Sequence, residues 1–255
     1  MRLRDSAATA LALLLTLTGC GVAGDLVGGH ADASPTPDSA QALRNAAEAL
    51  DRAPYSFQFR THDTIGVGAV DGSDGWLRLR AVGGDAGKVR LTFEVLHRDG
   101  EHLARSNPLT GDRWTRIDVR KVDPAARARL ERFGDPAHAS DLFAGIASAE
   151  PAGTGRYRGT LDFTRVPDVD TSGLVDEERL AALTEQQRAA VAFEATVDGQ
   201  QRLLGLRFTL PAAGGEPEQS SEISYSGHGF KPDLGAPFEG RIDPAPAAVY
   251  EVLND

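Results

Sequence analysis

Residues 89–105 read VRLTFEVLHRDGEHLAR, and this stretch determines the expected fold. From Val89 to Val95 an apolar side chain stands at every second position, which is the period of a β-strand with one buried face. The dipeptide Asp99-Gly100 is typical of a tight hairpin turn, and the residues from Glu101 to Arg105 return as the paired strand. The stretch therefore predicts an antiparallel hairpin with one apolar face.

The same alternation recurs on both sides of this hairpin, in segments joined by short glycine-containing turns. The expected strands are Ser56–Arg60, Ile65–Ala69, Trp76–Arg80, Arg113–Val119, Arg156–Arg165, Val191–Val197, Gln201–Leu210 and Glu222–Tyr225. Successive strands with short connections form an antiparallel meander, and one of its faces is expected to be buried.

Helical periodicity appears in the segments that interrupt the strands. Asp38 or Ser39 can cap a helix that Pro54 stops, and Asp135-Pro136 starts another whose apolar stripe is Leu142, Phe143, Ile146 and Ala149. Further helices are expected from Asp123 to Gly134, from Asp176 to Leu183, and around Thr184 and Gln187. The proline-containing tail from Gly235 is expected to be mainly irregular. This order predicts an α+β fold, a strongly curved antiparallel sheet with helices packed on its concave face and an apolar cavity between the two layers.

The first twenty residues have the features of an export signal. Arg2 and Arg4 precede an uncharged run from Ala7 to Thr18, which is too short to span a membrane, and Leu17–Cys20 closes it. Cys20 is the single cysteine of the chain, so it has no disulfide partner within it. Leu17-Thr18-Gly19-Cys20 resembles the lipobox of bacterial lipoproteins, and this resemblance implies that Cys20 is lipidated and becomes the first residue of the mature protein. We therefore expect a signal peptide over residues 1–19, a lipidated Cys20 with a flexible tether up to residue 37, and one domain over residues 38–255. A secreted soluble protein is the alternative.

The charge of the chain limits its partners. The formal net charge is −10 at pH 7, and removing residues 1–19 makes it about −11. This acidity argues against a nucleic-acid partner and against electrostatic adhesion to anionic lipid, so an acyl anchor on Cys20 would have to hold the protein on the membrane. The expected location is the extracytoplasmic face of the cell membrane.

The order of these features resembles the LppX/LprA/LprF/LprG family of actinobacterial lipoproteins. The residues that carry the resemblance are Leu17–Cys20, the tether, Ala42–Leu50, Ser56–Arg60, Asp135-Pro136 with Asp141-Leu142-Phe143, Gly155–Gly159, Asp198-Gly199 and Leu203–Leu210. The resemblance implies a half-barrel sheet folded over helices, similar also to the carriers LolA and LolB. It further implies that a cavity holds the acyl chains of a lipid or glycolipid.

The residues expected to line this cavity are the apolar ones of the strand and helix faces. They are Phe57, Phe59, Leu77, Leu79, Leu91, Phe93 and Val95 on the sheet, Leu142, Phe143 and Ile146 on the helix, and Phe163, Phe193, Leu206 and Phe208 on later strands. The alternative for each residue is that it fills a dry core, because periodicity does not report packing volume.

Two motifs could bind a metal, and in each case a simpler interpretation is favoured. Asp168, Asp170, Ser172 and Gly173 match part of a calcium loop, but its last position carries Arg179 where a glutamate is needed, so a surface turn explains the run better. His97 and His102 flank the Asp99-Gly100 turn and should face each other, as an exposed cross-strand pair without a third zinc ligand. No metal or other cofactor is expected.

Two functions remain open, and neither is enzymatic. The first is a membrane-anchored protein of the cell envelope that binds or transfers a lipid or glycolipid. The second is a module that binds another envelope protein, such as a transporter or a sensor, and carries no lipid. A hydrolase is less favoured than either, because no nucleophile with an adjacent base can be identified and no Gly-x-Ser-x-Gly elbow is present.

Overall fold

The computed structural model describes residues 38–83, 91–98, 100–124, 127, 130, 135, 137–166, 174–175, 177–233 and 242–254. These residues all belong to one compact unit, Pro37–Asp255. The expected signal peptide, Cys20 and the tether lie outside the described residues. The calcium-like run Asp168–Gly173 and most of the helix expected from Asp123 to Gly134 also lie outside them.

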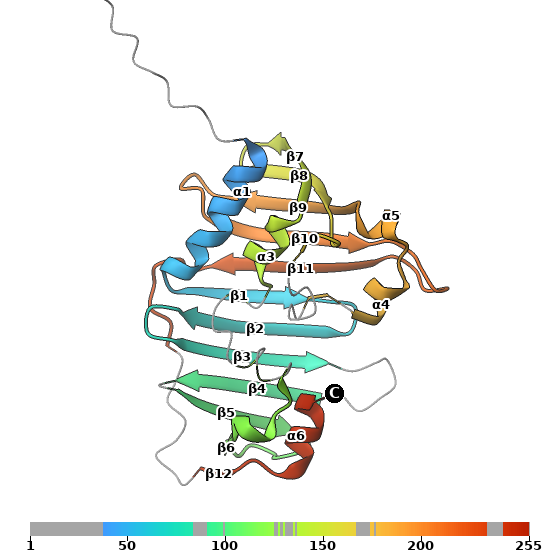
Figure 1. The fold of residues 1–255 in the computed structure, drawn as a ribbon. Helices are drawn as coiled ribbons and strands as arrows, with labels where there is room; N and C mark the ends of the chain where they lie inside the picture. Colours follow the sequence, from blue (N-terminus) through green and yellow to red (C-terminus); the bar gives the residue numbers. More distant parts are fainter. Residues whose placement is uncertain are drawn as a thin grey trace, which may run out of the picture. The chain divides into compact units, whose positions relative to one another are not determined.

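The described chain is an α+β fold built on one open sheet of twelve strands, in the order β12-β6-β5-β4-β3-β2-β1-β11-β10-β9-β8-β7 (Figure 1). All neighbours pair antiparallel except β12, which is parallel to β6. The strands are β1 (Tyr55–Arg60), β2 (Thr64–Asp71), β3 (Trp76–Gly83), β4 (Leu91–Arg98), β5 (Glu101–Asn107), β6 (Thr115–Arg116), β7 (Ile146–Gly153), β8 (Arg156–Leu161), β9 (Val191–Val197), β10 (Leu203–Leu210), β11 (Gln219–Ser226) and β12 (Asp243–Pro244). The helices are α1 (Ser39–Glu48), α3 (Ala139–Ala144), α4 (Glu177–Ala182), α5 (Glu185–Arg188) and α6 (Ala247–Asn254), with short 3-10 segments at Ala49–Arg52 and Val119–Lys121.

The first helix and the central hairpins form where their local signals predict them. Asp38 caps α1, since its carboxylate accepts the backbone N–H of Gln41 at 2.6 Å. The apolar side of α1 is buried, as its periodicity predicts. β4 and β5 pair around Gly100 (φ +77°) with His97 opposite His102, which confirms the hairpin of residues 89–105 over its described part.

The helix that follows Asp135 is shorter than its apolar spacing predicts. α3 ends at Ala144 with Gly145 as its C-cap, and Ile146 begins β7, a strand that the sequence interpretation missed. Ile146 pairs with Leu161, and the N–H of Asp162 donates to the carbonyl of Gly145 at 2.7 Å. A residue four positions after Leu142 suits a helix as well as the start of a strand, so tertiary pairing decided the outcome.

The C-terminal tail is also more regular than predicted. β12 pairs with β6, and α6 follows Pro246, a residue that suits the start of a helix. The side chains of Val249 and Tyr250 are buried, and the Tyr250 hydroxyl accepts the N–H of Asp118 at 2.9 Å. The expected strand from Arg113 to Val119 is in turn reduced to the two residues of β6.

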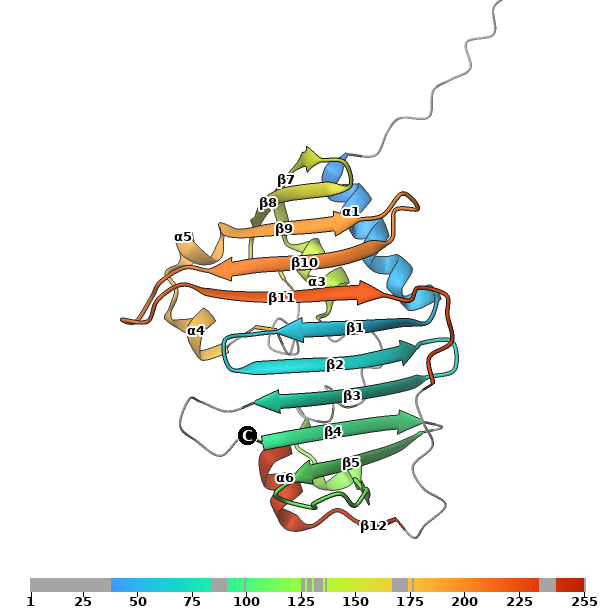
Figure 2. The same ribbon diagram turned by 180° about the vertical axis from the view of Figure 1, so that it is seen from behind.

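The two faces of the sheet differ in what covers them. α1 and α3 lie across one face, which we call the inner face (Figure 1), whereas the strands are unobstructed in the opposite view, on the outer face (Figure 2). Most of the buried side chains under α1 and α3 form one cluster, the α1 core. A second cluster, the α6 core, contains Ala104 of β5, Val249 and Tyr250.

On the outer face, Glu94 is buried between two arginines. Its side chain is 5% exposed, and its two oxygens accept hydrogen bonds of 2.6–2.8 Å from Arg78 and Arg105. Burial raises the pKa of the Glu94 carboxyl, but the hydrogen bonds and charges of the two guanidinium groups outweigh burial and lower it below its usual value. A lowered folded-state pKa stabilises the fold above the unfolded value, near 4.5, and this contribution is lost as the pH falls through the folded value.

We therefore expect Glu94→Gln to lower the free energy of unfolding by about 2 kcal/mol at pH 7. The difference from wild type should shrink as the pH falls below 4.5 and through the lowered pKa of the folded carboxyl, where the wild-type Glu94 side chain becomes neutral like glutamine. Urea titrations between pH 3 and pH 7 measure both effects. The control is Glu150→Gln, which breaks an outer-face pair with Arg158 whose side chains are 61% and 65% exposed, and which should cost less than about 1 kcal/mol. Equal losses in the two variants would contradict this explanation.

Candidate functional site

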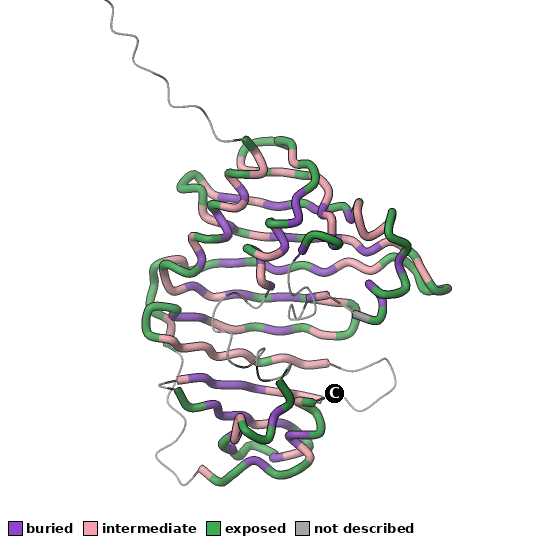
Figure 3. Tube along the Cα trace, viewed as in Figure 1, coloured by how far each residue is buried: buried purple, intermediate pink, exposed green. Residues whose placement is uncertain are grey.

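The buried surface of the inner face is interrupted at β3. None of the eight residues of this strand is fully buried, although buried residues lie on the neighbouring strands β2 and β4 (Figure 3). Its inner side chains Leu77 and Leu79 contact the α1 core, and so does Ala81. The α6 core begins beyond them, with Ala104 of β5. β3 therefore carries apolar side chains that remain partly accessible between two closed clusters.

β4 extends this accessible surface. Ala81 lies opposite Phe93, and Gly83 lies opposite Leu91, so both β4 side chains are on the inner face, and both are half-buried. We call Leu77, Leu79, Ala81, Leu91 and Phe93 the inner strip. It is apolar, and along β3 it covers about 13 Å, given about 3.3 Å of rise per residue.

The border of the strip toward the α1 core depends on two glycines of β2. Gly68 lies opposite Phe57 and Gly66 opposite Phe59, and both phenylalanine rings cover the glycines. A Cβ atom at Gly68 would come within 2.4 Å of the Phe57 ring, and one at Gly66 within 2.1 Å of the Phe59 ring. The two rings are near parallel, at 20°, and both residues are buried. They close the α1 core on the side of β3.

The fourteen residues predicted to line a cavity fall into two environments. Nine belong to the buried α1 core, namely Phe57, Phe59, Leu142, Phe143, Ile146, Phe163, Phe193, Leu206 and Phe208. Val95 is buried on β4, and the other four, Leu77, Leu79, Leu91 and Phe93, are the half-buried residues of the inner strip. The structure thus brings the sheet-side candidates together on one face, and the accessible ones form a single patch.

A polar cluster lies under α3, where the sequence predicted only a helix start. The helix starts later than predicted, at Ala139 with His138 as its N-cap residue, but the Asp135 carboxylate accepts the N–H groups of Ala137 and Ala139 at 3.1 and 2.7 Å. The Tyr225 hydroxyl donates to the same carboxylate at 2.7 Å. Burial raises the pKa of Asp135, and burial together with the Asp135 charge raises that of Tyr225. The Tyr55 ring meets the Tyr225 ring edge-on at 5.7 Å, and its buried hydroxyl has no hydrogen-bond partner in the described part of the chain.

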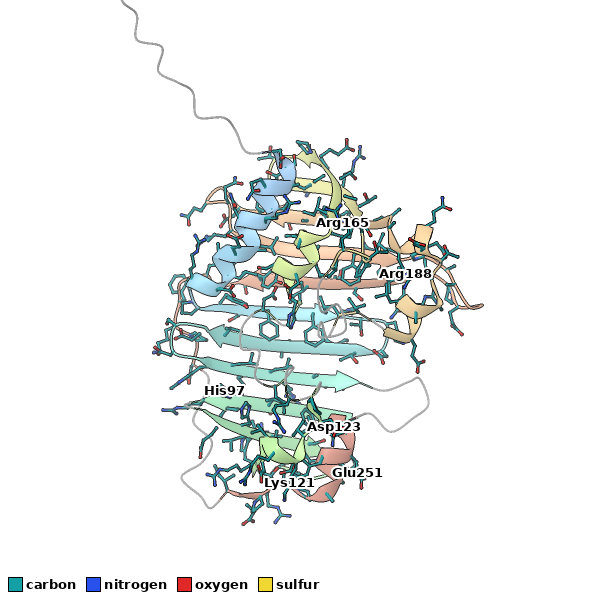
Figure 4. All side chains as sticks on the ribbon, viewed as in Figure 1. His97, Lys121, Asp123, Arg165, Arg188 and Glu251 are labelled. Carbon is teal, nitrogen blue, oxygen red and sulfur yellow. The ribbon has the colours of Figure 1, made fainter. Side chains whose placement is uncertain are left out.

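His97 and His102 face each other as predicted, but the expectation that they are exposed was wrong. Their Nδ1 atoms are 3.3 Å apart, and the two residues are 5% and 8% exposed. His97 lies opposite Leu77, so the pair belongs to the inner face, where the alternation of the strand places it (Figure 4). Among the described residues, no group of three potential metal ligands is found.

The outer face carries a row of alternating charges across six neighbouring strands. The row is Glu150, Arg158, Glu194, Arg207, Glu222 and Arg60, each residue directly opposite the next. A groove of about 720 Å³ lies over β7–β10 and is lined by Ser, Thr, Arg and Glu side chains. Because each cation stands beside a carboxylate, the row has no net charge and lacks the clustered basic residues that attract a polyanion.

The comparisons with known proteins leave the family open. No protein-family model matches the chain, and no curated protein matches it. No helix within the described residues is long and apolar enough to cross a membrane. The resemblance to the actinobacterial lipoproteins therefore stays a prediction, based on the order of the elements and on the residues of Leu17–Cys20.

Proposed function

We propose that the protein is a lipid-anchored protein of the cell envelope that holds the acyl chains of a lipid or glycolipid against the inner strip. The observation that supports this proposal is the interruption of the inner face at β3, where apolar side chains lie half-exposed between two closed cores. An exposed apolar patch that lies between packed regions is typical of a ligand surface. The anchor in this proposal is Cys20, and the sheet curves around the strip as a half-barrel with the cavity on its inner side.

The energetics fit an acyl chain better than a polar ligand. The inner strip offers no charged group, so recognition rests on apolar burial, which contributes about 0.8 kcal/mol for each CH₂ group. Ten buried CH₂ groups would therefore contribute about 8 kcal/mol before the entropy of ordering the chain is subtracted. No catalytic residue is needed for such binding, and the proposed activity is binding or transfer without bond breakage.

Native mass spectrometry tests the proposal directly. Residues 38–255, which contain all the described helices and strands and both cores, are expressed without Cys20 in an actinobacterial host. We expect mass adducts that disappear after organic extraction and that are recovered as lipid in the extract. A clean apo mass, with no uptake of added phospholipid or glycolipid, would contradict lipid binding and would favour the alternative, a module that binds an envelope transporter or sensor.

A further inference from the structure

At one end of the central strands, where β3 begins and β11 ends, an exposed aromatic side chain lies close to the end of the inner strip. β3 begins at Trp76, immediately before Leu77, and β11 ends at Ser226 on the same side, because Ser226 lies opposite the start of β1. The turn that follows β11 presents Phe230, which is 79% exposed, the highest value among the large apolar side chains described as exposed. We call Trp76, Arg98, Phe230 and Lys231 the Trp76 edge.

The backbone holds Phe230 in this exposed position. The N–H of Gly229 donates to the carbonyl of Pro54 at 2.8 Å, and the N–H of Phe230 donates to that of Gly227 at 3.0 Å. Gly227 and Gly229 have φ values of +64° and +81°, a region that favours glycine. An apolar ring on a hydrogen-bonded turn is presented to solvent without an ordering cost at the moment of binding, which suits a docking contact.

Trp76 lies beside this turn with cations close to its ring. The Arg98 guanidinium is 4.0 Å and the Lys231 ammonium 5.6 Å from the ring centre. Lys231 also pairs with Asp74, and its ammonium lies 3.8 Å from Asp71, so carboxylates offset its charge. Tryptophan and phenylalanine next to basic side chains form the composition that favours the interface between lipid headgroups and acyl chains. The local charge balance indicates that apolar insertion, and not attraction to anionic lipid, would dominate.

The proposed anchor lets this edge reach the bilayer. The segment from Cys20 to Asp38 spans at most about 60 Å when extended, and about 23 Å on average if it behaves as the flexible spacer that its composition predicts. α1 and the 3-10 turn Ala49–Arg52 separate Asp38 from the start of β1 by only about 20 Å. Because a short tether keeps the edge at a high local concentration near the membrane, one or two aromatic side chains are sufficient for docking.

We propose that the Trp76 edge docks on the membrane that holds the lipid anchor, so that the Leu77 end of the inner strip faces the bilayer from which lipid enters. This inference rests on the proposed function and adds the orientation in which the protein meets its lipid source. A protein partner that covers Phe230 is the alternative occupant, and it would leave Phe230 in water when only lipid is present.

Site-specific fluorescence in vesicles tests the orientation. The lipidated mature chain is reconstituted into phosphatidylcholine–phosphatidylglycerol vesicles after an environment-sensitive fluorophore is attached to Phe230→Cys. The matched control is Val67→Cys, because Val67 is 45% exposed but lies on the outer face of β2. We expect a blue shift and a several-fold gain in emission at position 230 and neither at position 67. Water-like emission at both positions overturns the docking edge.

Two further measurements separate this inference from the proposed function. Flotation of the vesicles reports the anchor, and a chain that does not float refutes the anchor and the docking with it. Phe230→Ser should slow the exchange of lipid between protein and vesicles several-fold, while native mass spectrometry shows unchanged lipid occupancy at equilibrium. Exchange at the wild-type rate, or a loss of occupancy, counts against docking through Phe230. A wild-type chain that floats with the vesicles but carries no lipid would refute the proposed lipid binding and leave the anchor in place.

Discussion

Gly68→Ala is expected to lower the free energy of unfolding by about 3 kcal/mol. The new Cβ atom would stand 2.3 Å from the carbonyl oxygen of Arg78 on the next strand and 2.4 Å from the Phe57 ring. The carbonyl belongs to the β2–β3 ladder and cannot move without breaking the pairing at the centre of the sheet. The Phe57 ring cannot move without exposing the part of the α1 core that it covers. Urea denaturation of both proteins measures the difference.

The control for this substitution is Gly205→Ala. Gly205 also lies inside a strand, but its Cβ atom would face the outer side, where the closest atom is the hydroxyl oxygen of Thr196 at 3.1 Å. That side chain can rotate away, so we expect a change within about 1 kcal/mol. If both variants lose the same free energy of unfolding, the close approach of the Arg78 carbonyl and the Phe57 ring to Gly68 does not explain the loss.

The elements with a strong local signal could be predicted from the sequence. Strict alternation and an Asp-Gly turn located the β9–β10 hairpin, and the Thr184 and Gln187 capping box indeed starts α5. Elements defined by long-range pairing could not be predicted. β7 depends on β8 for its hydrogen bonds, and α6 depends on the apolar surface that Ala104 and Ile117 offer, neither of which local periodicity reports.

The candidate site could be predicted in part. Alternation places Leu79 and Phe93 on the same face as Phe57, and this assignment is confirmed. Which of these side chains remain accessible depends on how far helices extend over the sheet, and periodicity carries no signal for that. Phe230 could not be recognised either, because in the sequence a single phenylalanine between Gly229 and Lys231 does not differ from a loop residue that packs inward.

Leu79→Trp is expected to weaken lipid binding roughly tenfold, which corresponds to about 1.4 kcal/mol. The larger side chain occupies the space of about two CH₂ groups of the cargo at the centre of the inner strip, and each displaced group contributes about 0.8 kcal/mol. Leu79 is half-buried and apolar, so the added ring can lie along the strip without burying a polar group other than its own N–H. Lipid titration followed by native mass spectrometry measures the change.

The control for Leu79→Trp is Val67→Trp on the outer face of β2. Val67 lies opposite Arg80 on β3 and is 45% exposed, so the same large ring is added one strand away from Leu79 but on the opposite side of the sheet. We expect wild-type lipid affinity for this variant and similar thermal unfolding for both. An equal loss of affinity in the two variants would show that the sheet as a whole responds to added bulk. Unchanged affinity in a folded Leu79→Trp protein would exclude the inner strip as the lipid surface.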